Sequence, residues 1–252
     1  MNADTLVVIP AWNEAPTIRR VIEQVRSLGL NLVVVNDGST DETAKVARLV
    51  NVPVLDIVSN QGVGSALRCG FRWAVEKGYT SVLQVDADGQ HDVKLAEALF
   101  RVASETNADI VIGSRFLGES QTYEVGRARR VVMRLMASSA SLRAGYALTD
   151  VTSGFRLIRQ PLLGHLAENL PNYYLGDTFE AVFVAAKRGY LIREVPVSMK
   201  ARSSGHSSAS RFEAVGMIFK TLAVTTLGLH FDIPDRSTYL KPKAKIEPAT
   251  YE

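Results

Sequence analysis

Residues 82–91 read VLQVDADGQH, an apolar run that ends in two aspartates one residue apart. The apolar part predicts a buried strand, and Asp86 and Asp88 fall directly after it. Two carboxylates this close repel each other unless a cation lies beside them, and their hard oxygen atoms suit Mg²⁺ or Mn²⁺ bridging a diphosphate. Gln90 or His91 could add a further ligand. An isolated Asp-x-Asp is more typical of a solvated acidic loop, so the pattern needs support from the rest of the chain.

The chain around this stretch alternates β-branched apolar runs with segments of helical periodicity. The runs that predict strands are 6–9, 32–35, 54–58, 82–85 and 110–112. The segments between them that predict helices are about 15–28, 41–49, 64–77 and 93–103. This alternation predicts a single-domain α/β fold with a doubly wound, mostly parallel sheet flanked by crossover helices. Further along the chain we expect a basic helix over 126–146, strands over 152–158 and 191–197, and helices over 178–187 and 211–227.

Ligands of such sheets bind beyond the carboxyl ends of the strands, so the loops that follow the strands are candidate sites. These loops are 10–14, 36–39, 60–62, 86–91 and 113–115. Asp37 comes too early to cap the next helix, which leaves it free for a ligand, whereas residues 39–41 are typical helix-capping residues. Asn13 and Glu14 fit either a helix start or the recognition of a nucleobase.

The composition limits the class of protein. The 252 residues are 46% hydrophobic and 22% charged, as in a globular enzyme with one large domain. The one cysteine, Cys69, excludes an internal disulfide, and the four histidines lack metal-ligand spacing, so no zinc site is expected. Residues 62–67 match a dinucleotide fingerprint only in part, and a Gly-x-x-x-x-Gly-Lys-Ser/Thr phosphate loop is absent.

No segment has the features of a signal peptide or a membrane span, because the apolar run 214–229 has 16 residues and contains Lys220. We therefore expect a cytoplasmic protein with its domain over residues 1–230 and a polar, loosely ordered tail over 231–252. Residues 1–100 hold nine basic and 12 acidic side chains, and residues 101–252 hold 20 and 14. The excess of basic side chains in residues 101–252 fits an anionic partner or a solvated surface; a nucleic acid is not expected.

The segment 126–146 holds five arginines and no acid. They are Arg127, Arg129, Arg130, Arg134 and Arg143. Apolar residues lie between them, as in an amphipathic helix on an anionic membrane surface at the cytoplasmic face. The alternative is a helix that packs in the core and turns its arginines to water.

Six motifs in this order resemble the family 2 glycosyltransferases. They are residues 9–14 (IPAWNE), 35–41 (VNDGSTD), 60–64 (NQGVG), 86–91 (DADGQH), 113–115 (GSR) and 153–156 (SGFR). The similarity covers about residues 5–228. It is strongest to the dolichyl-phosphate mannose synthase and polyprenyl-phosphate glycosyltransferase branch, through Asp150 ahead of the last motif and through residues 194–197 (EVPV) followed by Arg202 and Gly205.

The resemblance implies a GT-A fold and an inverting transfer of a hexose from a nucleotide diphosphate sugar, of the GDP-mannose or UDP-glucose type, with Mg²⁺ or Mn²⁺. It places the nucleoside among Pro10, Trp12, Glu14 and Asp37, the ribose or sugar at Asp86, and the metal at Asp88 and Gln90. Residues expected at the donor or acceptor phosphates are Arg115, Arg127, Arg202 and Ser207. Two departures are Ser208, where this branch often has lysine, and the polar, Pro-containing stretch after Leu229, where many relatives continue into paired membrane helices.

The acceptor that this branch implies is a polyprenyl phosphate, and a glycan or small-molecule hydroxyl is the alternative. A hydroxyl needs a general base, whereas a phosphate monoester is already anionic near neutral pH. The expected catalytic residues are therefore Asp86 and Asp88, with Asp177 and Glu180 as candidate bases. Asp177 equally fits an acid at a helix N-terminus. Other classes that remain are a sugar-phosphate nucleotidyltransferase, whose usual Gly-rich loop is replaced here by residues 10–14, and a noncatalytic nucleotide-binding subunit.

Overall fold

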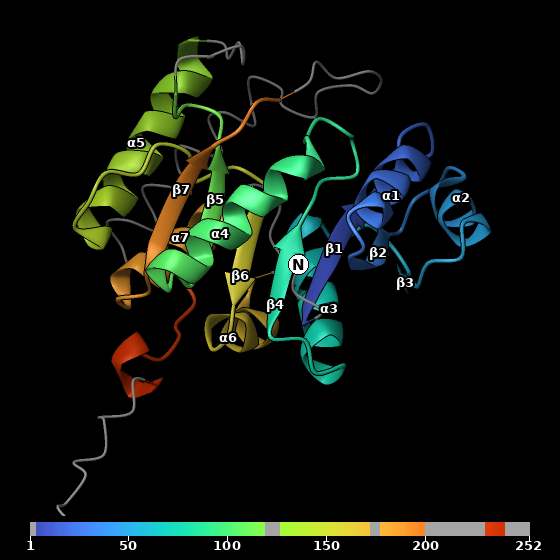
Figure 1. Cartoon of the computed structure of the whole chain (residues 1–252). Helices are drawn as coiled ribbons and strands as arrows, with labels where there is room; N and C mark the ends of the chain where they lie inside the picture. The colour runs from blue at the N-terminus through green and yellow to red at the C-terminus, as the bar shows by residue number, and fades with distance from the viewer. Residues whose placement is uncertain (1–3, 119–126, 172–176, 200–229, 240–252) are drawn as a thin grey trace, which may run out of the picture.

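A computed structural model describes residues 4–118, 127–171, 177–199 and 230–239 (Figure 1). Its strands are β1 (Thr5–Ala11), β2 (Asn31–Asp37), β3 (Val54–Ile57), β4 (Ser81–Gln84), β5 (Ile110–Ser114), β6 (Arg156–Arg159) and β7 (Ile192–Pro196). Its helices are α1 (Ile18–Ser27), α2 (Thr43–Leu49), α3 (Val63–Glu76), α4 (Ala96–Thr106), α5 (Arg127–Ala144), α6 (Leu162–Asn169) and α7 (Asp177–Lys187). Two 3-10 helices are η1 (Val93–Leu95) and η2 (Arg236–Tyr239).

The strands form one sheet in the order β3-β2-β1-β4-β6-β5-β7. Strand β6 pairs antiparallel with β4 and β5, and the other described pairs are parallel. The predicted α/β fold with a mostly parallel sheet is therefore confirmed. The predicted strand over 152–158 is wrong at its start, because residues 152–155 form a turn before β6.

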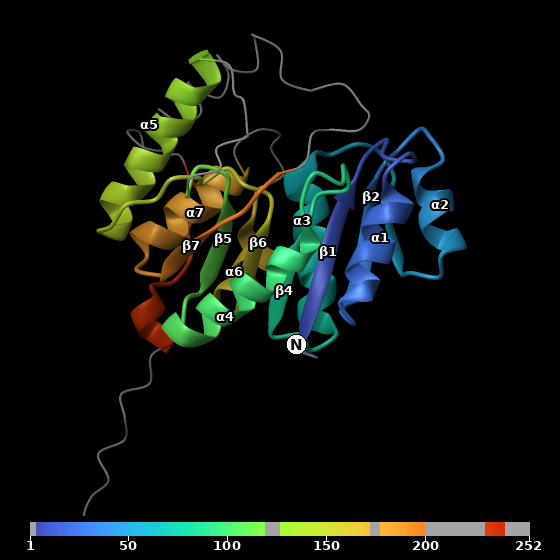
Figure 2. The ribbon, with the colours of Figure 1, turned by 45° about the horizontal axis from the view of Figure 1, so that its top comes forward.

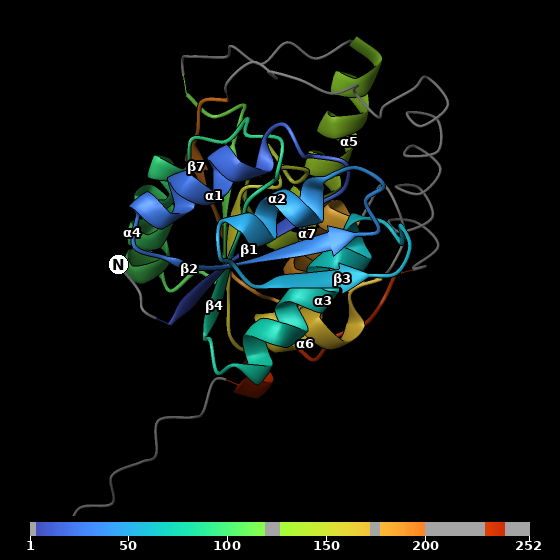
Figure 3. The same cartoon turned by 90° about the vertical axis from the view of Figure 1, so that its right-hand side faces the viewer.

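Helices cover both faces of this sheet (Figure 3). Successive side chains of a strand point to opposite faces. Leu6 and Val8 of β1 belong to the core cluster that includes residues of α3, α6 and α7, while Val7 and Ile9 belong to the cluster that includes residues of α1 and α4. Helix α5 lies outside α7 and contacts it (Figure 2). Because both faces are buried, the strands read as continuous apolar runs, which explains why the sequence predicts most of them correctly.

Three segments differ from expectation. Residues 93–103 divide into η1 and α4, and the short helix α6 is not foreseen by the sequence. Residues 231–239 are not loosely ordered, because Ile233 is 3% exposed in the core and Arg236 Nε lies 2.6 Å from Asp109 Oδ2; the rest of the expected tail lies outside the described residues. An apolar side chain and an ion pair hold this part of the tail on the body. The predicted helix over 211–227 lies outside the described residues.

Candidate active site

The loops after β1 and β2 are bonded to each other at the carboxyl edge of the sheet. The Asn13 side-chain oxygen accepts from the backbone N–H of Thr40 at 2.9 Å, and the Ser39 hydroxyl accepts from the backbone N–H of Asn13 at 3.0 Å. The Asp41 carboxylate accepts from the backbone N–H of Thr43 at 2.9 Å, where α2 begins. Asp41 thus bonds the first N–H of α2 from the position before the N-cap residue, Glu42. Ser39 and Thr40 instead join the two loops, so the capping interpretation is wrong for these two residues.

Glu14 lies four residues before helix α1 and accepts hydrogen bonds at its N-terminus. Its carboxylate accepts from the Thr17 hydroxyl at 2.9 Å, and its carbonyl oxygen accepts from the backbone N–H of Ile18 at 2.9 Å. Pro10 is buried in β1, whereas Trp12 keeps 47% of its surface exposed. Of the two interpretations of Glu14, the structure shows the helix start, and Trp12 is the large side chain of this loop that a ligand can reach.

Asp37 anchors the loop that precedes α3. It is 3% exposed, and its two carboxylate oxygens accept from the backbone N–H groups of Gln61 at 2.9 Å and Gly62 at 2.8 Å. Burial raises the pKa of Asp37, and the two hydrogen bonds offset this only in part. The expectation that Asp37 is free for a ligand is wrong. The next residue, Gly38, has φ +64°, and a Cβ there would lie 2.5 Å from backbone atoms of Ser59 and Asn60 in the loop before α3.

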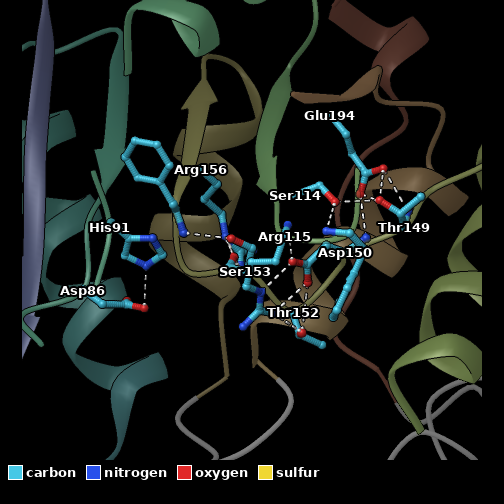
Figure 4. A network of polar contacts seen from close by, with 12 residues as sticks. Asp86, His91, Ser114, Arg115, Thr149, Asp150, Thr152, Ser153, Arg156 and Glu194 are labelled. Carbon is cyan, nitrogen blue, oxygen red and sulfur yellow. Dashed lines mark hydrogen bonds and ion pairs between the residues drawn. The ribbon is translucent and has the colours of Figure 1, made fainter. Parts of the chain in front are cut away.

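Asp86 follows β4 and faces His91 (Figure 4). Its Oδ2 lies 3.1 Å from Nε2 of His91, whose side chain is 3% exposed and stacks on Phe155 with ring centroids 5.2 Å apart. On the other side, a Cβ added at Gly154 would collide with both carboxylate oxygens of Asp86. The Asp86 side chain remains 38% exposed, so it is confined yet open to a ligand.

Cations around Asp86 keep it ionised. Burial raises its pKa, but the His91 hydrogen bond and the charges of His91, Arg156 and Arg115 together outweigh burial and hold the pKa below its ordinary value. Asp86 therefore presents a carboxylate at neutral pH.

Asp88 and Gln90 lie in the turn that follows. The Asp88 carboxylate accepts from the backbone N–H of Gln90 at 3.0 Å, and Gly89 between them has φ +71°. Within the described ranges no three His, Cys, Asp or Glu side chains gather around one point. The oxygen donors of Asp88 and Gln90 suit a hard divalent cation, which would take its remaining ligands from elsewhere, such as a diphosphate and water.

Arg115, expected at a phosphate, forms a buried ion pair instead. Its Nε and Nη2 atoms donate to the two carboxylate oxygens of Asp150 at 2.6 and 2.7 Å, and Nη2 also donates to the Thr152 hydroxyl at 2.9 Å. The side chains of Arg115 and Asp150 are 8% and 0% exposed. Burial raises the pKa of Asp150, but Arg115 outweighs it and holds the pKa below its usual range. A phosphate would reach Arg115 only by competing with Asp150.

Glu194 of β7 extends this network (Figure 4). Its carboxylate accepts from the backbone N–H groups of Thr149 at 2.8 Å and Asp150 at 2.7 Å. The Thr149 hydroxyl lies 2.6 Å from that of Ser114 at the end of β5. Burial raises the pKa of Glu194, and these hydrogen bonds oppose the rise in part. The network joins β5, β7 and the loop between α5 and β6; Asp150 and Glu194 stand in the family motifs, but nothing in the sequence pairs them.

Arg156 connects the turn beside Asp86 to α7. It is 2% exposed, and it donates to the carbonyl oxygens of Ser153 at 2.8 Å and Thr178 at 3.1 Å. Glu180, two residues further along α7, is 4% exposed and accepts from the backbone N–H of Phe231 at 3.1 Å. Glu180 therefore fastens the described tail to the helix. Among the other expected residues, Arg202 and Ser207 lie outside the described residues, as do the side chains of Arg127 and Asp177.

Helix α5 has one buried side and one exposed side. One side packs in the core, and its buried residues are Val132, Met133, Met136, Ala137 and Ala140. The opposite side exposes Val131, Leu135 and Leu142 by 55%, 58% and 80%. Arg130, Arg134 and Arg143 are exposed as well. In the described part of the chain, no helix is both long and apolar enough to span a bilayer.

Comparison with known proteins identifies the family. The chain is 29% identical over 213 residues to an undecaprenyl-phosphate mannosyltransferase of Micrococcus luteus, covering 81% of this chain and 87% of that one. It is 30% identical over 230 residues to a polyprenol monophosphomannose synthase of Mycolicibacterium smegmatis, covering 86% and 84%.

The fold has close structural neighbours. The glucosyl-3-phosphoglycerate synthase of Mycobacterium tuberculosis, solved with Mn²⁺, UDP and glucosyl-3-phosphoglycerate, superposes with a TM-score of 0.67 at 22% identity over 88% of this chain and 79% of that one. This likeness confirms the expected GT-A fold. The sequence profile described as Glycosyl transferase family 2 matches residues 6–166, which include β1 to β6 and the turn with Asp86 and Asp88, and the chain belongs to that family.

Proposed function

We propose that this enzyme transfers a hexose, with inversion at the anomeric carbon, from a nucleotide diphosphate sugar to a polyprenyl phosphate. The observation that carries the proposal is the turn 86–90, in which an ionised Asp86, Asp88 and Gln90 follow β4 at the carboxyl edge of the sheet. Ligands bind at this edge in open α/β sheets. The names of the two mannosyltransferase relatives support the lipid phosphate acceptor.

The residues of this turn fit a divalent cation. Asp88 and Gln90 would hold Mg²⁺ or Mn²⁺ through oxygen atoms, and Asp86 would lie beside the ribose or the sugar. A bound metal neutralises the charge that develops on the departing nucleoside diphosphate. A structural neighbour solved with Mn²⁺ and UDP supports the use of a divalent cation.

Trp12 is the proposed contact of the nucleobase. Its exposed side chain stands in the loop after β1; Glu14 fixes the end of the same loop and Asp37 fixes the loop before α3 through the hydrogen bonds described above. These two acids would then act on nucleoside binding by shaping the loops. Both a GDP-mannose type and a UDP-glucose type of donor fit this proposal.

The acceptor side favours a phosphate over a hydroxyl. Glu180 is buried and bonded to the backbone of Phe231, so it is poorly placed to take a proton from a hydroxyl acceptor. Asp177 is then the remaining candidate base. A phosphate monoester, already anionic near pH 7, needs no base at all.

The outer side of α5 is the proposed contact with the membrane. It exposes Val131, Leu135 and Leu142 beside Arg130 and Arg134. Apolar side chains can enter the interface of a bilayer, and each basic residue near anionic lipids contributes about 1 kcal/mol of binding. Such a surface would hold the enzyme peripherally at the cytoplasmic membrane face, where a lipid phosphate is presented.

The reaction is tested with the purified chain, Mn²⁺, a panel of nucleotide sugars that includes GDP-mannose and UDP-glucose, and polyprenyl phosphate in detergent. We expect release of nucleoside diphosphate with one donor, together with a glycolipid product. Asp88→Ala should lower the rate at least about a hundredfold, whereas Asp92→Ala, four residues further along, should leave it nearly unchanged. Release of pyrophosphate from a nucleoside triphosphate would indicate a nucleotidyltransferase, and no release from any donor would indicate a noncatalytic subunit.

The membrane contact is tested with liposomes. Arg130→Gln combined with Arg134→Gln should lower co-sedimentation with phosphatidylglycerol vesicles and slow transfer to polyprenyl phosphate in them, without changing transfer in detergent. Arg19→Gln combined with Arg101→Gln removes the same charge from α1 and α4 and serves as the control. Equal sedimentation of the two double variants contradicts the proposed contact.

A further inference from the structure

The Asp86 carboxylate lies between the His91 ring and the backbone of Gly154, an arrangement that we call the clamp. On one side His91 Nε2 donates to it over 3.1 Å, and on the other the backbone of Gly154 approaches so closely that a Cβ would collide with both oxygens. A side chain held on both sides has little freedom to change its rotamer. The exposed part of Asp86 therefore points to the ligand edge in one fixed direction.

His91 is itself held rigidly. Its side chain is 3% exposed, its ring stacks on Phe155 at an interplanar angle of 21°, and its backbone forms an isolated β-bridge with Met199. Its other ring nitrogen, Nδ1, is buried without a hydrogen-bond partner in the part of the chain that the structure describes. A histidine kept for packing alone would need no hydrogen-bond partner for either ring nitrogen, whereas here Nε2 lies within hydrogen-bond distance of a carboxylate of the candidate site.

Hydrogen bonds from Arg156 to the preceding residue fix the backbone at Gly154. The carbonyl oxygen of the preceding residue, Ser153, accepts two hydrogen bonds from the buried Arg156, at 3.2 and 2.8 Å. Arg156 also donates to Thr178 in the first turn of α7. The wall opposite His91 is thus fixed to the helix that begins with Asp177.

We propose that His91 is a positioning residue for Asp86, with Gly154 as the opposing wall of the clamp. The proposal rests on the proposed function, in which Asp86 acts beside the ribose or sugar of the donor. Partners that hold a site residue in its productive geometry affect the rate, because a misplacement of about 1 Å can cost about a hundredfold. The clamp should therefore raise kcat more than it lowers KM.

Two variants of His91 separate its hydrogen bond from its packing. His91→Phe keeps a ring against Phe155 and removes the donor; we expect kcat for transfer to fall about 10- to 100-fold, with the donor KM changed by less than about threefold. His91→Gln keeps an amide donor at a similar reach and loses the ring; we expect it to recover most of kcat. The reverse order, with His91→Phe active and His91→Gln impaired, would show that the ring only packs and would overturn the proposal.

Gly154→Ala tests the opposite wall. Its Cβ should displace the Asp86 carboxylate and lower kcat as much as His91→Phe does, and the double variant should lose little more, because both changes release the same side chain. His165→Phe, on α6 and away from this turn, is the control for loss of a histidine. Thermal unfolding establishes that each variant folds, and a loss of kcat fully explained by unfolded protein counts against the clamp.

Crystal structures of the wild type and of His91→Phe give a readout that needs no activity. We expect the Asp86 carboxylate to leave its position by more than about 1 Å in the variant, and an unmoved carboxylate overturns the proposal. A wild-type enzyme that releases nucleoside diphosphate from no donor refutes the proposed function instead, and the two failures are thereby distinguished.

Discussion

Asp37 and Asp150 are two buried carboxylates that the fold holds in different ways. Counted as whole residues, with their backbone atoms, Asp37 and Asp150 are 3% and 1% exposed. Asp37 accepts from two backbone N–H groups and its pKa lies above the ordinary value, whereas Asp150 faces the guanidinium of Arg115 and its pKa lies below it. Backbone dipoles therefore do not fully replace the water that Asp37 loses, while a paired cation more than replaces it for Asp150.

The same contrast divides the molecule. The loops after β1 and β2 are joined by bonds between side chains and backbone N–H groups, as at Asn13 and Ser39. The region from Arg115 to β7 is joined by buried charges, through the pair of Arg115 with Asp150 and through Glu194. A lost carboxylate should therefore cost more in the second region than in the first.

The largest effect is expected from Asp150→Ala. This change leaves the Arg115 guanidinium buried without its carboxylate, and breaking a buried ion pair from one side typically costs about 3–5 kcal/mol. The free energy of unfolding in urea, measured at neutral pH, checks this value.

The control is Glu42→Gln, which breaks an exposed ion pair with Lys45 and should leave the unfolding midpoint unchanged. Arg115→Met combined with Asp150→Leu sharpens the comparison, because removing both charges should recover much of the lost stability. A loss for Asp150→Ala as small as that for Glu42→Gln would mean that the buried pair does not stabilise this region.

Sequence reasoning predicted the strands and the acidic turn after β4 well because their signals are local. The strands are apolar over their whole length, and Asp86 and Asp88 follow one of them directly. It failed where a contact joins distant residues: Arg115 and Asp150 are 35 positions apart, and Asp150 and Glu194 are 44 apart. The periodicity of the sequence carries no signal of pairs this far apart. The ion pair of Arg115 with Asp150 is therefore not predicted, and Arg115 is expected at a phosphate instead.

The errors at β6 and Asp37 have the same origin. Residues 152–155 resemble the start of a strand, yet Gly154 must leave room for Asp86, which only the folded chain brings beside it. Asp37 was expected to be free because its partners, Gln61 and Gly62, lie in a loop beyond the next strand. Helix ends and strand cores follow from local pattern, whereas the partners of polar side chains follow from topology.

A smaller effect is expected from Asp37→Ala. It leaves the N–H groups of Gln61 and Gly62 without their acceptor, which costs about 1–3 kcal/mol, without stranding a charge. Urea unfolding measures the loss, and hydrogen exchange at Gln61 and Gly62 should accelerate in the variant. A cost equal to that of Asp150→Ala would abolish the distinction between the two regions.

The smallest expected effect is that the stability contributed by Asp150 and the stability contributed by Asp37 change in opposite directions with pH. A carboxyl whose folded pKa is lowered, as for Asp150, contributes stability above the unfolded value of 3.8 and loses it as pH falls through the folded pKa. A carboxyl whose folded pKa is raised, as for Asp37, contributes stability that is complete below 3.8 and is lost as pH rises through the folded pKa.

Unfolding free energies of the wild type, Asp150→Asn and Asp37→Asn between pH 7 and pH 3 test these signs, because each difference from wild type removes the titration of all other groups. The advantage of the wild type over Asp150→Asn should shrink as pH falls, and its advantage over Asp37→Asn should grow. Each slope is at most about 1.4 kcal/mol per pH unit, since one proton is involved. Two curves that bend the same way would show that burial, rather than the presence of Arg115, sets the pKa of both carboxylates, and the contrast between the regions would then lose its electrostatic basis.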